Sequence, residues 1–224
     1  MDLGLKGCRA LITGGSKGIG LRCAEIFADE GASVSICARN AKDVATAVDG
    51  LRAKGVDAYG EAVDVSDKSA LEAWVANSAQ ALGGIDMVVG NVSALAVADD
   101  EEAWRQGFDT DMMHSVRLVN AALPWLENSA AGSITLVASV SGREIDFTGA
   151  AYGAFKAAIV HYAQGLAFKF AGQNIRANTV SPGNTYFEGG IWASIETDNP
   201  ELFAEAISLN PTGRMAKPEE IARA

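Results

Sequence analysis

Short apolar runs alternate with longer stretches of helical periodicity along the chain, and this alternation constrains the fold more than any other feature. The runs that predict strands are Cys8–Thr13, Ser33–Ala38, Ala58–Val63, Ile85–Val89, Ser133–Ala138 and Ile175–Ser181. The stretches that predict helices are Gly18–Glu30, Ala41–Lys54, Asp67–Leu82 with Ser66 as its N-cap, Glu101–Leu126 and Ala151–Ala171. Because parallel strands need crossover connections, usually helices, the alternation predicts an α/β fold with one doubly wound parallel sheet and helices on both faces.

The 224 residues contain no internal repeat, low-complexity tract or convincing linker, so we expect a single domain over residues 1–224. The pattern loosens over residues 184–216, where glycine and proline pairs interrupt it. A long irregular segment in a compact domain is often a lid or binding loop, so a substrate lid is expected there. Short helices are predicted in and after it at Ile191–Ile195, Leu202–Leu209 and Lys217–Ala224.

The balance of charged residues excludes some classes of partner. Lys and Arg number 18 against 28 Asp and Glu, and the resulting net charge of −10 repels polyanions, so no nucleic acid is expected. The three cysteines show no CxxC spacing and no nearby histidine, which predicts buried reduced thiols and no metal site. No apolar run has the length of a membrane span and no secretory pattern opens the chain, so we expect a cytoplasmic protein without a membrane partner.

The glycine turn, Thr13-Gly14-Gly15-Ser16-Lys17-Gly18-Ile19-Gly20, lies between the first predicted strand and the first predicted helix. Glycines there let the backbone approach a pyrophosphate, and free N–H groups at a helix start stabilise its negative charge. The spacing is GxxxGxG rather than GxGxxG, and glycines also serve simple tight packing. The position between strand and helix favours a nucleotide site with contacts from Gly14, Ser16, Lys17, Gly18, Ile19 and Gly20.

The end of the second predicted strand indicates which dinucleotide is bound. A protein that binds NAD usually has a carboxylate there, about 20 residues after the glycine turn, for the ribose 2′-hydroxyl. This strand instead ends Ala38-Arg39-Asn40, without a carboxylate. Arg39 and Lys17 could together bind a 2′-phosphate, which favours NADP(H) as the cofactor; the alternative is that both are ordinary surface cations.

Tyr152 and Lys156 are four residues apart near the start of a predicted helix, so their side chains lie on one face. A nearby ammonium group stabilises a phenolate, so Lys156 is expected to lower the pKa of Tyr152 from its usual value of about 10. Ser139 ends the fifth predicted strand, and open α/β sheets bind ligands at the carboxyl ends of their strands. A YxxxK spacing is common by chance, so two ordinary helix residues are the alternative.

Together these motifs resemble the short-chain dehydrogenase/reductase family, with general similarity to its 3-oxoacyl reductase-like branch. The matching pieces are the glycine turn, Asp64-Val65, Asp86–Asn91, Ser139, Tyr152-x-x-x-Lys156 and Asn178-x-x-Ser181-Pro182-Gly183. They follow the family's order and approximate spacing over nearly all of the chain. The resemblance implies a Rossmann-like fold and homodimers or homotetramers with contacts through the helices of 101–126 and 151–171.

The resemblance also implies a role for each matching residue. Tyr152 would be the catalytic acid or base, Lys156 would hold the nicotinamide ribose, and Ser139 would polarise the substrate carbonyl. The remaining cofactor contacts would come from Asp64 and Val65 at the adenine, Asn91 near a ribose, and Pro182, Gly183 and Thr185 at the carboxamide. The hydride transfer itself would belong to the cofactor.

The sequence departs from the family at several positions. The family's Asn-Asn-Ala-Gly reads Gly90-Asn91-Val92-Ser93, and the helix asparagine that often completes the catalytic group is Asp111. An ionised aspartate cannot donate a hydrogen bond, so a proton relay through Lys156 would be altered. Phe187 stands where threonine is usual, although Thr185 is close by. The family's seventh strand does not follow the last helix, so we expect that this sequence is part of a longer chain.

Three other features are interpreted from their positions. His114, three residues after Asp111, is expected at the surface or in an interface. Trp192 either lines an apolar substrate pocket or only holds the lid together. Residues 144–147 lie in the loop where the family varies its substrate specificity.

The expected activity is hydride transfer between NADP(H) and a carbonyl compound or secondary alcohol. A 3-oxoacyl thioester is the first candidate substrate and a cyclic ketone or hydroxysteroid the second, and neither follows from specific residues. The alternative from another class is an NADP-binding regulatory or assembly protein that kept the site and lost turnover. The presence of Ser139, Tyr152 and Lys156 together favours the enzyme.

Overall fold

The computed structural model describes residues 3–146 and 150–224. Within them, one six-stranded parallel sheet has the strand order β3-β2-β1-β4-β5-β6. Its strands are β1 (Arg9–Thr13), β2 (Ser33–Ala38), β3 (Ala58–Ala62), β4 (Met87–Gly90), β5 (Ser133–Val137) and β6 (Arg176–Val180). The chain winds outward from β1 to β3 and then returns to the other side of β1, so the predicted doubly wound, Rossmann-like fold is confirmed.

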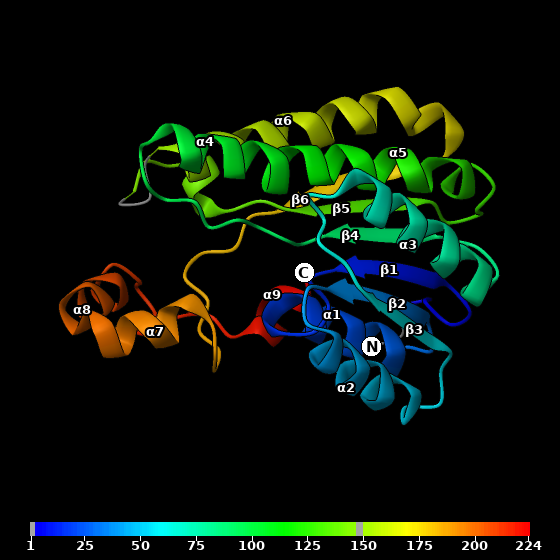
Figure 1. Ribbon diagram of the computed structural model, residues 1–224, viewed down its shortest axis with the longest axis horizontal. Coiled ribbons are helices and arrows are strands. Elements are labelled where there is room, and N and C mark those ends of the chain that lie inside the picture. The colour runs from blue at the N-terminus through cyan, green and yellow to red at the C-terminus, as the bar shows by residue number, and fades with distance from the viewer. Residues whose placement is uncertain (1–2, 147–149) are drawn as a thin grey trace.

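Helices cover both faces of the sheet (Figure 1). One face carries α1 (Gly18–Asp29), α2 (Ala41–Arg52) and α9 (Pro218–Ala222). The other face carries α3 (Lys68–Leu82), α5 (His114–Leu126) and α6 (Ala151–Phe170). Neighbouring strand residues supply the two cores in alternation: Leu11 packs under α3, α5 and α6, whereas Ile12 packs under α1 and α2. Burial on both faces explains why these strands are continuous apolar runs.

The predicted helix over Glu101–Leu126 is interrupted. It consists of α4 (Glu101–Gly107), the π-helical turn η1 (Phe108–Met113) and α5. A π-helical turn widens the helix locally and changes the phase of the residues that follow it, which hydrophobic periodicity does not reveal. Asp111 lies in this turn and is buried.

The predicted N-cap of α3 was wrong by one residue. Asp67 is the N-cap, and its side chain accepts a hydrogen bond from the Ala70 N–H at 3.0 Å. The Ser66 hydroxyl donates instead to Asp64 Oδ1 at 2.7 Å. Both residue types cap helices well, so the local sequence alone did not separate them.

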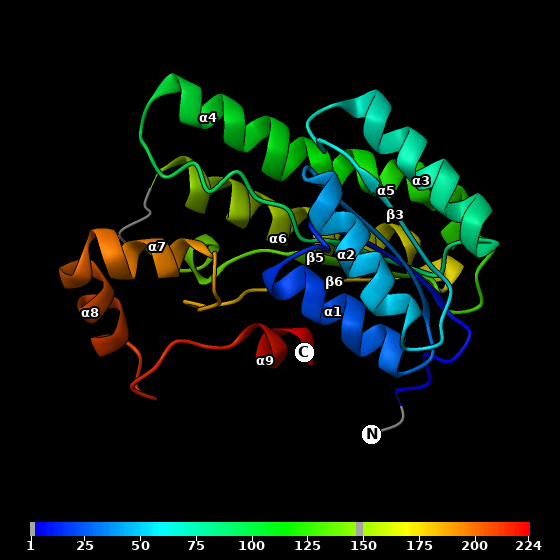
Figure 2. The same ribbon diagram turned by 60° about the horizontal axis from the view of Figure 1, so that its bottom comes forward.

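The 184–216 segment contains the two predicted helices, as α7 (Ile191–Asp198) and α8 (Pro200–Ser208). They stand apart from the sheet in both ribbon views (Figures 1 and 2). A small cluster of their own, built on Trp192, Ala206 and Met215, holds them together. The segment is therefore a separate layer beyond the carboxyl ends of the strands.

The described residues also bear on what the sequence predicted for cysteines, membrane spans and metal sites. Cys8, Cys23 and Cys37 are free thiols, of which Cys23 and Cys37 are buried and Cys8 is half-buried. Over residues 3–146 and 150–224, no helix combines the length and apolar character needed to cross a membrane. The same residues contain no group of three or more His, Cys, Asp or Glu side chains arranged to hold a metal ion.

Candidate active site

A cavity of about 530 Å³ lies at the carboxyl ends of the strands, between the sheet and the 184–216 segment. The strand order reverses between β1 and β4, and open α/β sheets bind ligands at such a point. The structure brings nine of the predicted site residues to its walls: Lys17, Ile19, Asn91, Ser139, Tyr152, Lys156, Pro182, Gly183 and Thr185. They come from five separate parts of the chain.

The glycine turn fits a bound dinucleotide. Gly14 and Gly18 have positive φ angles of 65° and 53°, which residues with a Cβ rarely adopt. A Cβ on Gly20 would lie 2.3 Å from the Gly14 carbonyl oxygen, and one on Gly14 would lie 2.9 Å from Asn91 Nδ2. Only glycine fits this close packing, which keeps the turn tight at the N-terminus of α1, where free N–H groups can stabilise a phosphate group.

Asn91 connects the end of β4 to the glycine turn. Its backbone N–H donates to Thr13 Oγ1 at 3.0 Å, and its Nδ2 donates to the Thr13 carbonyl oxygen at 3.1 Å. These bonds hold the Asn91 side chain against the turn at the edge of the cavity.

His114 is buried, so the expected surface position was wrong. Its Nε2 lies 3.0 Å from Thr13 Oγ1, and a Cβ on Gly90 would lie 3.9 Å from its Cε1. Burial, together with the positive charge of Lys156, lowers the pKa of His114 to about 4. The imidazole is therefore neutral at physiological pH. Gly90 was no signal for this burial, because the atom nearest a Cβ there is Leu136 Cδ2 at 2.9 Å and His114 lies only at ordinary contact distance.

Lys156 and Asp111 form a buried ion pair. Lys156 Nζ lies 3.1 Å from Asp111 Oδ1, and each side chain is 2% exposed. The ammonium group also donates to the Val137 carbonyl oxygen at 3.0 Å and lies 5.7 Å from the centre of the Tyr152 ring. The Ala94 N–H donates to Asp111 Oδ2 at 2.9 Å, so both carboxylate oxygens face polar groups.

The pKa of Tyr152 is raised, contrary to the expected lowering by Lys156. Burial raises it most, and the negative charges of Asp111 and Asp146 raise it further, while a hydrogen bond with Ser139 lowers it. The expectation failed mainly because it left out the burial of the Tyr152 hydroxyl, and also because it counted the ammonium of Lys156 without the carboxylate of Asp111 paired with it. Tyr152 is therefore a phenol at neutral pH and is suited to donating a proton.

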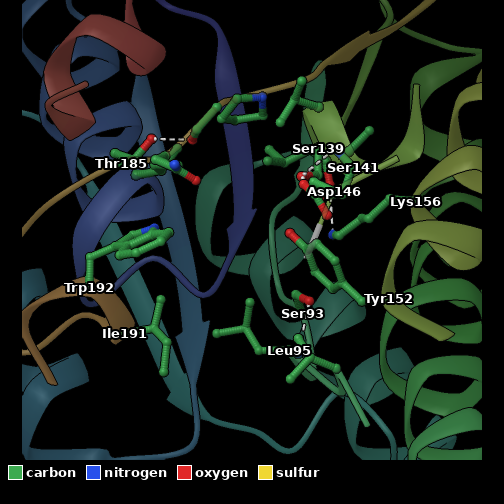
Figure 3. Close-up of a pocket in the computed structure, with 18 of the residues that line it drawn as sticks. Ser93, Leu95, Ser139, Ser141, Asp146, Tyr152, Lys156, Thr185, Ile191 and Trp192 are labelled. Atoms are coloured by element: carbon green, nitrogen blue, oxygen red, sulfur yellow. Dashed lines mark hydrogen bonds between the residues drawn. The ribbon is translucent and has the colours of Figure 1, made fainter. Parts of the chain in front are cut away.

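Ser139 begins a row of hydrogen bonds along the cavity wall. Its hydroxyl donates to Ser141 Oγ at 3.2 Å, and Ser141 Oγ donates to Asp146 Oδ2 at 2.6 Å. Figure 3 shows Ser139, Ser141 and Asp146 beside Tyr152 and Lys156. Sequence reasoning missed Ser141, although its place two residues after Ser139 was visible. Of the loop 144–147, only Asp146 lines the cavity among the described residues, and Phe147 lies outside them.

Of the residues predicted for the adenosine half of the cofactor, Arg39, Asp64 and Val65 do not line this cavity, whereas Lys17 does. Arg39 is exposed after β2, and Lys17 forms an ion pair with Asp43 at 2.8 Å. Hydrogen bonds from Ser66, and to a smaller extent the charge of Arg39, lower the pKa of Asp64. Val65 is buried, and the other predicted cofactor residues outside the cavity are Gly14, Ser16, Gly18 and Gly20.

The wall of the cavity opposite Ser139 and Tyr152 is apolar. Ile191 and Trp192 face Ser139 and Tyr152 across the cavity (Figure 3). Trp192 also packs within the 184–216 segment, so the alternative that it only holds this segment together is wrong. The other apolar lining residues include Leu95, Val97, Ile195 and Leu202.

The approach to the glycine turn is partly covered by Phe187. A Cβ on Gly18 would lie 2.6 Å from the edge of the Phe187 ring, so the ring lies directly over the turn. Thr185 anchors the same stretch of chain, because its hydroxyl donates to the Gly183 carbonyl oxygen at 3.0 Å and it pairs with Ala216 in a parallel bridge.

Comparison with known proteins agrees with this geometry. The family model for short chain dehydrogenases matches residues 9–198. Isoepoxydon dehydrogenase of Penicillium expansum is 38% identical over 229 residues, covering 99% of this chain and 87% of that protein. The 3-oxoacyl-[acyl-carrier-protein] reductase of Chlamydia pneumoniae is 29% identical, covering 100% of this chain and 90% of that protein. The crystal structure of L-sorbose reductase from Gluconobacter frateurii, complexed with NADPH and L-sorbose, matches with a TM-score of 0.89 and 31% identity, covering 100% of this chain and 89% of that one. The chain belongs to the short-chain dehydrogenase family.

Proposed function

We propose that this protein transfers a hydride between NADP(H) and a carbonyl compound or secondary alcohol. The observation that carries the proposal is one continuous cavity from Lys17 and Ile19 at the glycine turn to Ser139, Tyr152 and Lys156. Such a cavity offers a dinucleotide and a small substrate a shared space beside the catalytic side chains. When bound, the nicotinamide supplies or accepts the hydride.

The residues of this chain hold the substrate oxygen and move its proton. Tyr152, kept neutral by burial, donates its proton to the substrate oxygen as that oxygen gains negative charge. Ser139 gives a second hydrogen bond to the same oxygen after its hydroxyl turns away from Ser141. Lys156 directs two of its three N–H groups to Asp111 and Val137, and the third serves a ribose hydroxyl.

The preference for NADP(H) rests on the end of β2. Arg39 is exposed there, and no carboxylate stands in residues 38–40 to bind a ribose 2′-hydroxyl. Arg39→Ala is expected to weaken NADPH binding about tenfold or more, because a charge-assisted hydrogen bond to phosphate is lost, and to leave NADH binding unchanged. Arg105→Ala on α4 is the matched control. An unchanged ratio of the two affinities in Arg39→Ala refutes the assignment.

Two substrate classes remain candidates, a 3-oxoacyl thioester and a compact cyclic ketone. The cavity is lined by apolar side chains, among them Leu95, Ile191 and Trp192, and by the carboxylate of Asp146, which repels anionic groups near the reacting carbonyl. This arrangement favours a neutral ketone that carries a hydroxyl group able to bond to Asp146. The name of the similar isoepoxydon dehydrogenase gives isoepoxydon, and not an acyl thioester, as its substrate, which also weighs against the thioester class. The 184–216 segment, whose residues supply much of the apolar wall, is the proposed substrate lid.

The test combines binding and turnover. NADPH and NADH are titrated separately by fluorescence, and then cyclic ketones and 3-oxoacyl thioesters are offered with the tighter cofactor. Tyr152→Phe is expected to lower kcat by about 10²–10⁴, the usual contribution of a general acid, without weakening NADPH binding. Tyr162→Phe, on the same helix, is the control. Full activity in Tyr152→Phe refutes the mechanism, and tight cofactor binding without turnover of any substrate favours the regulatory alternative.

A homo-oligomer formed through the helices of 101–126 and 151–171 is part of the proposal. Trp104 is 41% and Phe108 is 47% exposed there, and both rings contact Phe155 of α6. A second copy of this chain would cover these aromatic rings. Light scattering during gel filtration distinguishes a monomer from a dimer or tetramer, and Trp104→Glu is expected to shift the protein toward monomer.

A further inference from the structure

Asp111 places a full negative charge inside the catalytic site. Its side chain is buried to the same extent as that of Lys156, with 3.1 Å between Oδ1 and Nζ. Burying two charges costs several kcal/mol of solvation for each ion, so such a pair persists only where geometry and further hydrogen bonds compensate. The contacts that compensate for the burial of this ion pair must therefore lie in its immediate surroundings.

The surroundings hold the carboxylate of Asp111 in place. The Ala94 N–H donates to Oδ2 at 2.9 Å from the chain that follows β4, and Ser115 Oγ donates to the Asp111 backbone oxygen at 2.9 Å. An asparagine could also accept the bond from Ala94, because its amide oxygen is an acceptor. The feature that aspartate adds at this position is its charge.

The charges around the Tyr152 hydroxyl come from several elements. Lys156 on α6 is positive, whereas Asp111 in η1 and Asp146 in the loop before α6 are negative. His114 at the start of α5 is neutral, because burial lowers its pKa to about 4. Burial raises the pKa of the Tyr152 phenol most, and the two negative charges of Asp111 and Asp146 raise it further.

We propose that Asp111 is a positioning residue: its carboxylate anchors the ammonium group of Lys156 and offsets its charge, so the hydroxyl of Tyr152 stays protonated and serves as the proton donor in carbonyl reduction. This inference rests on the proposed function. In the step concerned, a bound reduced nicotinamide would supply the hydride, its C–H bond breaking as the new C–H bond forms at the carbonyl carbon, and the C=O π electrons would move to oxygen. The Tyr152 O–H bond breaks as that oxygen takes its proton, and the phenolate then regains a proton from water.

The test is a titration of Tyr152 without cofactor or substrate. Phenolate absorbance is followed against pH in the wild type and in Tyr152→Phe, and the difference between the two curves isolates Tyr152. Its ionisation is expected above the ordinary tyrosine value of about 10. Asp111→Asn is expected to move the ionisation to lower pH, because the Lys156 ammonium loses its counter-ion and the phenolate replaces it. Asp109→Asn, in the same π-helical turn, is the matched control and leaves the curve unchanged.

Two results overturn the proposal. One is that wild-type Tyr152 ionises near neutral pH, and this measurement does not depend on whether any Asp111 variant folds. The other is a folded Asp111→Asn protein whose Tyr152 titrates as in the wild type, since a purely structural role would lower only the Tm. Because no turnover is measured, a wild type that reduces no ketone refutes the proposed function and leaves this titration readable. In an active enzyme, the pH profile of kcat for reduction is expected to fall off at lower pH in Asp111→Asn.

Discussion

Gly20→Ala tests whether the close packing of the glycine turn sets cofactor affinity. The added Cβ would lie 2.3 Å from the Gly14 carbonyl oxygen and 2.7 Å from Asn91 Nδ2. The first distance is about 0.7 Å shorter than 3.0 Å, the separation below which real Cβ contacts are essentially never found. Because the nearest contact is backbone rather than a flexible side chain, the turn itself must move, and Asn91 must move with it.

The size of the effect follows from this displacement. Overpacking a well-packed site costs about 1–3 kcal/mol. If the turn relaxes by opening toward the cofactor site, that cost appears in cofactor binding, as a loss of about 5- to 150-fold in NADPH affinity. If the turn resists, the same cost appears as a lower free energy of unfolding. The sum of the two losses is expected to be about 1–3 kcal/mol.

The assay measures both quantities on the same protein. NADPH affinity is obtained by fluorescence titration, and the free energy of unfolding by urea denaturation without cofactor. Gly50→Ala is the control, because Gly50 is exposed in the interior of α2 and an added Cβ meets nothing within 4 Å. It is expected to raise stability by about 0.5–1 kcal/mol and leave affinity unchanged. A Gly20→Ala protein with wild-type affinity and wild-type stability refutes the packing argument.

Three further outcomes are expected. The pKa of His114 is about 4 in the folded protein and has a reference value of 6.5. Between these two pH values the unfolded chain therefore binds more protons than the folded chain, so the free energy of unfolding is expected to fall by about 3 kcal/mol as the pH drops from 6.5 to 4. Urea denaturation across this range should show that His114→Gln removes this loss and His161→Gln keeps it. Trp74→Phe is expected to lower the free energy of unfolding by about 1–3 kcal/mol, because the fully buried indole loses its 3.1 Å bond to Ser35 Oγ; unchanged denaturation would contradict this. Phe187→Thr is expected to speed NADPH association in stopped-flow fluorescence, because the ring covers the glycine turn, and an unchanged rate constant would exclude a covering role.

The strands and most helices could be predicted because they follow the patterns that sequence periodicity reports. Ser33–Ala38 was predicted with the bounds that β2 has, and β1 begins one residue later than expected. Burial on both faces produces continuous apolar runs, and these are visible without long-range information. The predicted and observed strand bounds differ more where a buried residue does not pair with a neighbouring strand. Ile85, for example, is buried but precedes β4.

The buried polar side chains of the site could not be predicted in the same way. His114 is a polar residue in a predicted helix, so a position at the surface or in an interface was the simpler interpretation. Asp111 was identified only by its place in a family motif. Their partners are distant in sequence: Thr13 for His114 and Lys156 for Asp111. Pairings of this length leave no local pattern, and the π-helical turn that orients both residues is defined by backbone hydrogen bonds rather than by residue type.

The same turn connects the two halves of the cavity. Asp111 and His114 are three residues apart, so their side chains leave the helix on adjacent parts of one face. Asp111 contacts Lys156, and His114 contacts Thr13, the first residue of the glycine turn. Thr13 in turn binds Asn91 at the cofactor edge of the cavity. Because close-packed interiors do not deform continuously, a shift of the π-helical turn would move Lys156 and the glycine turn together. The position of Lys156 relative to the glycine turn is therefore set by one shared element, the π-helical turn, rather than by two independent ones.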